Sequence, residues 1–91
     1  MQIEEIFKSS PLQIIKLYLN DDRYVNNITG FAHELGIAHT TVRKHLNLLV
    51  SLGILKELNI GKGKAFILNI DNSYTKAFIS FYDRCKEIEK G

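Results

Sequence analysis

Cysteine, long apolar runs and targeting signals are scarce or missing in this sequence of 91 residues. The single cysteine, Cys85, cannot form an internal disulfide, so we expect a protein of the reducing cytoplasm. No apolar run approaches the roughly 18 residues that span a bilayer. The opening MQIEEIFK has acids where a secretory signal has bases. These features favour a cytoplasmic protein over a secreted or membrane protein.

Motifs for catalysis and metal binding are missing as well. The sequence has no GxxxxGK[ST], HExxH or GxSxG, and Cys85 lies on an apolar stripe, as expected for a small core residue. His33, His39 and His45 are six residues apart, so successive histidines would point about 240° apart on a helix. A zinc site needs three or four converging ligands, which this spacing does not favour. We therefore expect no enzyme, no cofactor and no metal.

The composition is that of one small globular domain with a local surplus of bases. Hydrophobic residues make up 45% and charged residues 24% of the chain, and the length suits a single domain over residues 1–91. Residues 31–70 carry five bases (Arg43, Lys44, Lys56, Lys62 and Lys64) against two acids. A basic surplus confined to the middle of the chain is typical of a site for an anionic partner.

Three amphipathic helices are predicted in the first part of the chain. Ser10 as N-cap and Pro11 at the first position predict a helix over 11–20. Asn27 is expected to cap a helix over 28–35, which ends at Gly36. The third helix, 39–52, has apolar residues at the spacing of one buried face. The residues of that face are Val42, Leu46, Leu49 and Val50.

Only three residues, GIA, separate the second and third helices. Helices joined this closely must cross steeply, which is the geometry of a helix-turn-helix. After Gly53 the pattern changes to the alternation of strands, and it predicts a β-hairpin with GKGK, residues 61–64, at its tip. The residues expected on one apolar face of this hairpin are Leu58, Ile60, Phe66, Leu68 and Ile70.

The stretch FAHELGIAHTTVRKHLNLLVSLGILKEL resembles the winged helix-turn-helix of ArsR-type and related MarR-type prokaryotic transcriptional regulators. The matching positions are Ala32, Gly36, Ile37, Val42, His45, Leu46, Leu49, Gly53, Ile54 and Leu55. The match spans residues 12–70, and the hairpin falls where the family places its wing. The resemblance implies a mostly helical α+β fold: a winged-helix core over 11–70 with a β-hairpin wing, and a C-terminal dimerisation helix over 73–90.

Two features depart from the family pattern. Ala38 stands where members commonly have a Ser or Thr N-cap, which leaves open whether the third helix begins at His39 or is capped by Thr40. The cysteine pair of metal-sensing members is absent from this sequence. The resemblance therefore gives no support to metal sensing.

The resemblance implies that the third helix enters the major groove of DNA. The expected DNA-binding residues are His39, Thr40, Thr41, Arg43, Lys44, Asn47, Lys62 and Lys64. Arg43 could donate two hydrogen bonds to guanine, Asn47 could pair with adenine, and Lys44 suits a phosphate. Three other interpretations stay open: a solvated face on a protein–protein adaptor, an architectural chromatin-type protein, and an RNA-binding domain.

Residues 73–90 carry apolar residues spaced 4, 3, 4 and 3 apart, which is a heptad-like pattern. This helix could pack on the first helix of its own chain or pair with a second copy. The resemblance implies the second arrangement, and hence a homodimer. The expected interface consists of Ile3, Ile6, Phe7, Tyr74, Phe78, Phe81, Tyr82, Cys85 and Ile88. We expect a dimeric repressor that binds double-stranded DNA in the cytoplasm, at the nucleoid.

Overall fold

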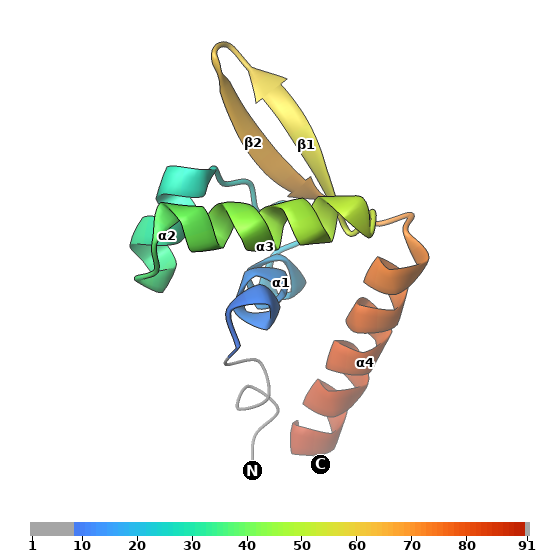
Figure 1. The fold of residues 1–91 in the computed structure, drawn as a ribbon. Helices are drawn as coiled ribbons and strands as arrows, with labels where there is room; N and C mark the ends of the chain where they lie inside the picture. Colours follow the sequence, from blue (N-terminus) through green and yellow to red (C-terminus); the bar gives the residue numbers. More distant parts are fainter. Residues whose placement is uncertain (1–8, 91) are drawn as a thin grey trace.

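The computed structural model describes residues 9–90 as four helices and one β-hairpin. In chain order these elements are α1 (Ser10–Asn20), α2 (Ile28–Leu35), α3 (His39–Ser51), β1 (Leu55–Ile60), β2 (Gly63–Leu68) and α4 (Ser73–Lys90). In Figure 1, α3 crosses the molecule above α1. The hairpin projects upward beyond α3 as a wing, and α4 runs downward at the lower right. The predicted mostly helical α+β winged-helix architecture is confirmed.

The helix-turn-helix formed by α2 and α3 has the boundaries that the sequence predicts, except that α3 ends at Ser51, one residue before the predicted end. The Asn27 side chain accepts a hydrogen bond from the Gly30 N–H at 2.7 Å and so caps α2. Gly36 ends α2 with φ at 67°, a left-handed conformation in which glycine has no steric penalty. The third helix begins at His39, directly after Ala38, so Thr40 lies inside its first turn and does not cap it.

The N-terminal cap of α1 differs from the prediction by one residue. Ser9, with extended backbone, is the N-cap, and its carbonyl accepts a hydrogen bond from the Gln13 N–H at 2.9 Å. Pro11, which lacks an N–H, is tolerated in this first turn because no intrahelical acceptor is available there. The short helix considered for QIEEIFK, with Ile3, Ile6 and Phe7, lies outside the described residues.

The core lies between α1, α2, α3 and the base of the hairpin. Its fully buried side chains include Ile14, Tyr18, Phe31, Val42, Leu46, Leu49, Ile54 and Leu55. The predicted buried face of α3 is confirmed at Val42, Leu46 and Leu49. The Tyr18 hydroxyl donates to the Phe66 carbonyl at 2.8 Å and thereby joins α1 to β2. Burial raises the pKa of Tyr18 far above its ordinary value.

The two faces of the hairpin differ from the prediction. The strands are antiparallel, with Ile60 opposite Gly63 and Leu58 opposite Ala65, whereas Phe66 lies opposite Glu57. Residues directly opposite each other share a face, so Leu58 and Ile60 lie on the face opposite to Phe66. The single apolar face expected for Leu58, Ile60, Phe66, Leu68 and Ile70 is therefore wrong.

The reason for this difference is the even number of residues in the turn, a property that the predicted four-residue tip, 61–64, would share. The turn has two residues, 61 and 62, and Gly61 supplies the positive φ that a tight hairpin turn requires at its first position. A turn with an even number of residues always pairs even-numbered with odd-numbered positions. Leu58, 38% exposed, and Ile60, 60% exposed, are consequently turned away from the core, and Ile70 lies beyond β2.

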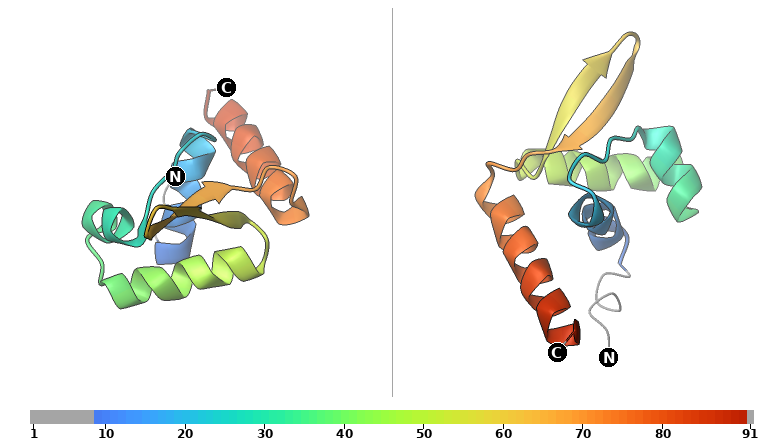
Figure 2. Two further views of the ribbon diagram at one scale, coloured as in Figure 1. Left: turned by 90° about the horizontal axis from the view of Figure 1, so that it is seen from above. Right: turned by 180° about the vertical axis from the view of Figure 1, so that it is seen from behind.

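One side of α4 packs on its own chain. Asn72 caps the helix by accepting from the Thr75 N–H at 3.1 Å. The hydroxyl of Tyr82, whose side chain is buried, donates to the Asn20 side chain at 2.8 Å, and Figure 2 shows α4 running beside α1. Tyr82 is therefore buried within its own chain, against α1, and is not exposed as the predicted interface requires. Of residues 9–90, no helix is long and apolar enough to cross a membrane.

Candidate nucleic-acid interface

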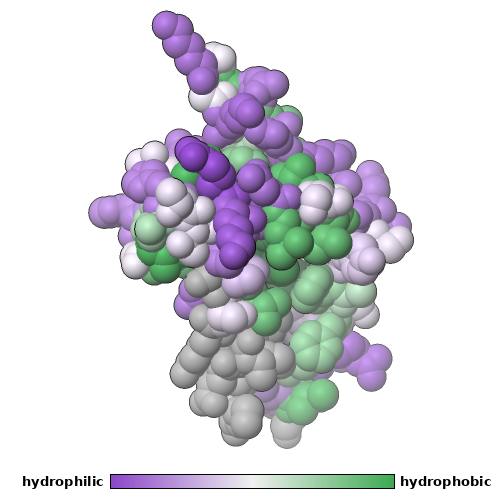
Figure 3. Space-filling view, in the orientation of Figure 1, coloured by the Kyte–Doolittle hydropathy of each residue, from purple (hydrophilic) through white to green (hydrophobic). Residues whose placement is uncertain are grey.

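The face of α3 opposite the core carries most of the residues that the sequence singles out for DNA. Thr40, Arg43, Lys44 and Asn47 are exposed, while Thr41 is half-buried at the margin. Figure 3 shows hydrophilic side chains over the middle of α3 and along the projecting hairpin. Because the wing projects beside this helix (Figure 1), both can approach one partner from the same side.

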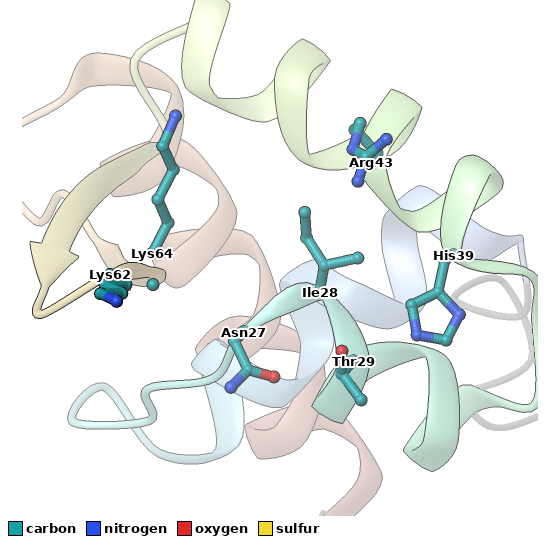
Figure 4. Close-up of a pocket in the computed structure, with 8 residues that line it drawn as sticks. Asn27, Ile28, Thr29, His39, Arg43, Lys62 and Lys64 are labelled. Carbon is teal, nitrogen blue, oxygen red and sulfur yellow. The ribbon is translucent and has the colours of Figure 1, made fainter.

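A hollow of about 400 Å³ lies where the start of α2, the start of α3 and the wing come together. Its lining residues are Asn27, Ile28, Thr29, His39, Arg43, Lys62, Gly63 and Lys64. In Figure 4, His39 and Arg43 extend from α3, Asn27 and Thr29 from the start of α2, and Lys62 and Lys64 from the hairpin. We call this site the basic hollow, because its lining, within residues 9–90, contains four basic side chains and no acidic one.

An ion pair lies at the wing side of the basic hollow. The Lys64 ammonium and the Glu57 carboxylate are 2.9 Å apart, and the two side chains are 60% and 36% exposed. Lys64 lies opposite Asn59, so Glu57 is its diagonal neighbour on the same face of the hairpin. Glu57 thus neutralises part of the positive charge that Lys64 brings to the hollow.

Hydrogen bonds fix the start of α2 against the wing. Phe66 donates its N–H to the Asn26 carbonyl at 2.9 Å, which ties the residues before α2 to β2. The Asn26 amide donates to the Tyr24 hydroxyl at 2.8 Å, and that hydroxyl donates to the Glu34 carboxylate. Burial, followed by the hydrogen bond to Glu34, raises the pKa of Tyr24. The start of α2 and the hairpin, which form two sides of the basic hollow, are therefore held together by the hydrogen bond between Phe66 and Asn26.

The close approach of α2 to this network depends on Gly30. A Cβ at position 30 would lie 1.8 Å from Oδ1 and 2.7 Å from Cγ of Asn26. The same Asn26 Oδ1 accepts the Asn27 N–H at 2.8 Å. The absence of a side chain at Gly30 thus allows Asn26 to keep its position directly before Asn27, which lines the hollow.

The structure divides the predicted DNA-binding residues into two groups. It brings His39, Arg43, Lys62 and Lys64 together in the basic hollow, and it leaves Thr40, Thr41, Lys44 and Asn47 along α3 outside it. Asn27, Ile28 and Thr29 also line the hollow and were not predicted from the sequence as site residues. The predicted cap at Asn27 was the available signal, since the start of a helix presents N–H groups that suit a phosphate.

The histidines and Cys85, all within the described residues, are not grouped as metal ligands would be. Within residues 9–90, no group of three or more His, Cys, Asp or Glu side chains is placed to hold a metal ion. His33 is exposed on α2, His45 is half-buried on α3, and Cys85 is half-buried on α4.

Comparisons with known proteins show the fold. No family model and no curated protein matches the chain. Its structure is similar to that of a "possible transcriptional regulator" from Methanosarcina mazei Go1, with 20% sequence identity and a TM-score of 0.59. The similarity covers 99% of this chain and 88% of the other. The chain therefore shares the fold of that possible regulator, while membership of the ArsR or MarR family stays a prediction.

Proposed function

We propose that this protein is a dimeric transcriptional regulator that binds specific sequences of double-stranded DNA and represses transcription by occupying promoter DNA. The observation that carries the proposal is the basic hollow, which lies beside the exposed polar face of α3. A helix of a helix-turn-helix reads bases in the major groove, while neighbouring basic groups hold the phosphates. The description of the similar M. mazei protein as a possible transcriptional regulator agrees with this role.

In the proposed complex, α3 lies in the major groove. Asn47 is placed to pair with adenine, Lys44 to meet a phosphate, and Thr40 and Thr41 to reach phosphates or a thymine methyl group. Arg43 lies at the border between the exposed face and the basic hollow, so it can reach a guanine or the flanking phosphate.

A backbone phosphate occupies the basic hollow in the same complex. Lys62 and Lys64 supply donors and positive charge, and His39 adds a ring N–H donor. The first turn of α2 adds N–H groups of the kind that bind phosphate at helix starts. The tip of the wing then lies on the adjacent backbone or in the minor groove.

A two-fold dimer would place two copies of α3 about one helical turn of DNA apart, which predicts a roughly palindromic site. The exposed aromatic residues of α4, Tyr74 and Phe81, favour this assembly. We propose that the dimer acts in the cytoplasm, on nucleoid DNA.

The test is fluorescence anisotropy of labelled mixed-sequence duplex DNA between about 50 and 200 mM salt. If Arg43, Lys44, Lys62 and Lys64 of both protomers all meet phosphates, log K falls with log salt with a slope of about −7. The Arg43→Ala/Lys44→Ala double variant should lose much of this affinity and about half of the slope. Lys76→Ala/Lys90→Ala removes the same charge from exposed positions on α4 and should bind almost as wild type does.

Two results would contradict the proposal. Absence of binding by the wild-type protein at about 50 mM salt would argue for a protein–protein adaptor. Equal losses in the two double variants would show that net charge, and not the surface of α3, governs binding. Salt-steep binding that only the Arg43→Ala/Lys44→Ala variant loses would support the proposal and justify a search for the operator.

A further inference from the structure

A second hollow lies on α4, and the described residues that line it present almost only apolar groups. Its volume is about 300 Å³, and its lining residues are Tyr74, Ala77, Phe78 and Phe81. These residues occupy positions i, i+3, i+4 and i+7 of one helix. Four residues in this arrangement form the hole that receives a side chain of a second helix in knobs-into-holes packing. Apolar side chains are visible along α4 in Figure 3.

Ile88 is an exposed apolar side chain on α4 that does not line the hollow. It lies on the same stripe of α4 as Tyr74 and Phe81, and at 75% exposure it is the most exposed large hydrophobic residue within 9–90. It follows the centre of the hollow by about 16 Å along the helix axis, so it cannot fill the hollow of its own chain. A second copy of the chain can supply it.

We propose that Ile88 of a second copy fills the α4 hollow, with the two α4 helices antiparallel. A two-fold axis between the helices places each Ile88 in the hollow of the other copy, so both hollows are filled by one contact. The inference rests on the dimer of the proposed function, and it adds the direction, the register and the residues of the contact.

The same register pairs a second set of side chains. Arg84 lies four residues, or about one helical turn, before Ile88. Phe81 lies about one turn from the centre of the hollow, in the direction of Ile88. Both are exposed, and the antiparallel arrangement brings Arg84 of one copy level with Phe81 of the other. A guanidinium against an aromatic ring is a favourable contact.

A parallel pairing in register fits the hollow less well. It would bring Ala77 and Phe78 of the second copy to the level of the hollow. The Ala77 methyl group is too small to fill a space of about 300 Å³, and the half-buried Phe78 side chain is already packed against the core of its own chain. The hollow would remain largely empty, and its lining would lose the contacts that stabilise a packed interface.

The available area indicates a weak dimer. From their exposed fractions, Tyr74, Phe81 and Ile88 together offer on the order of 300 Å² of side-chain surface per copy. This is less than half of the roughly 800 Å² per partner in a standard stable interface. We therefore expect association that depends on protein concentration and that shared binding to DNA strengthens.

The direct test is disulfide cross-linking of an Ala77→Cys/Ile88→Cys variant in a Cys85→Ser background, without DNA. The proposed register places position 77 of one copy opposite position 88 of the other. Mild oxidation at high protein concentration, which favours a weak dimer, should then give a disulfide-linked dimer. Within one chain the two positions are about 16 Å apart, while a disulfide needs Cα atoms within about 7 Å. Any disulfide that forms must therefore join two chains.

The controls separate the alternatives. Each single-cysteine variant, Ala77→Cys or Ile88→Cys, should cross-link far less than the double variant, since a parallel pairing would bring identical positions together. In sedimentation velocity, Ile88→Ser should shift the protein toward monomer. Ile70→Ser, at a side chain 54% exposed and outside α4, should leave association unchanged.

A folded double variant that gives no cross-linked dimer would overturn the inference, as would single variants that cross-link equally well. Identical sedimentation of Ile88→Ser and Ile70→Ser would overturn it too. These results are independent of DNA. Salt-steep DNA binding by a protein that fails to cross-link would refute this register alone, and cross-linking by a protein without DNA affinity would refute the regulatory role alone.

Discussion

Lys64 on β2 forms an ion pair with Glu57 on β1, 2.9 Å away, at the margin of the hollow that we assign to a DNA phosphate. The pair crosses the hairpin diagonally, and both side chains are partly exposed. Exposed pairs of this kind contribute about 0–1 kcal/mol to stability. Their larger effect here is electrostatic, because a phosphate that enters the hollow must compete with the Glu57 carboxylate for Lys64.

The first prediction concerns this competition. Glu57→Gln should raise DNA affinity by about three- to tenfold at about 150 mM salt and steepen the salt dependence, because Lys64 of each protomer becomes available to phosphate. Thermal unfolding should change by only a few degrees. Anisotropy titrations at several salt concentrations measure the effect.

Asp83→Asn is the matched control for Glu57→Gln, since it removes the same charge from an exposed position on α4. It should change DNA affinity much less. Equal gains in the two variants would show that the long-range field of the whole protein acts, and not the local pair.

The second prediction concerns Gly30. In Gly30→Ala the new Cβ displaces the Asn26 side chain, which then loses its hydrogen bonds to the Asn27 N–H and the Tyr24 hydroxyl. Two hydrogen bonds stabilise by about 2 kcal/mol, and alanine recovers up to about 1 kcal/mol through its helix propensity. We expect a net loss of about 1 kcal/mol in the free energy of unfolding, measured with urea.

A double-mutant cycle identifies the cause. In an Asn26→Ala background the obstructing side chain is absent, so Gly30→Ala should there be neutral or stabilising. The same loss in both backgrounds would contradict the contact between Gly30 and Asn26 as the reason for glycine at this position.

The third prediction concerns the buried hydroxyl of Tyr18. Tyr18→Phe removes the donor to the Phe66 carbonyl and should lower the free energy of unfolding by about 1–2 kcal/mol near neutral pH. The pKa of Tyr18 is raised by burial, so the folded state holds its proton at a pH where the unfolded chain releases it. The stability linked to this proton is fully present below about pH 10 and is lost as the pH rises above it, by up to about 1.4 kcal/mol per pH unit.

Urea unfolding of wild type and Tyr18→Phe between pH 7 and about pH 11 measures both effects. The difference between the two proteins should shrink above about pH 10, because only wild type carries this titration. Tyr74→Phe, at a side chain 57% exposed, is the control and should unfold as wild type does near neutral pH. A constant difference between wild type and Tyr18→Phe at all pH values would contradict the linkage.

Local signals predicted the helix-turn-helix correctly, whereas the error at Tyr82 came from a contact with a distant residue. Asn27 and Gly36 define the ends of α2 through contacts within a few residues, so the sequence contains that information. Tyr82 was misplaced because its neighbours on α4 suggest an interface, whereas its actual partner, Asn20, is 62 residues away.

The basic hollow could be predicted only in part for the same reason. Arg43 and Lys62 are recognisable as DNA-binding candidates from the basic surplus and the resemblance. No pattern along the chain indicates that the wing lies beside the start of α2. The contact that holds it there is the hydrogen bond from the Phe66 N–H of β2 to the Asn26 carbonyl. The faces of the hairpin depend on whether its turn has an even or odd number of residues. The predicted tip, 61–64, and the observed turn, 61–62, are both even, so a single apolar face was already incompatible with the predicted tip.

The last prediction separates base recognition from phosphate binding on α3. Lys44 and Asn47 are both exposed, three residues apart on the same polar face, and neither lines the basic hollow. Lys44→Ala should weaken binding to all sequences alike and reduce the magnitude of the salt slope by about 2, one phosphate contact for each protomer of the dimer. Asn47→Ala should leave the salt slope unchanged and weaken binding to the operator by about 1–3 kcal/mol per contact, while affinity for unrelated DNA stays the same. Selection of operator sequences from a random pool, followed by anisotropy on the selected and unrelated duplexes, measures both quantities. If the two variants change the slope and the specificity in the same proportion, the division of α3 into base-reading and phosphate-binding residues is wrong, and the helix contacts DNA through its charge alone.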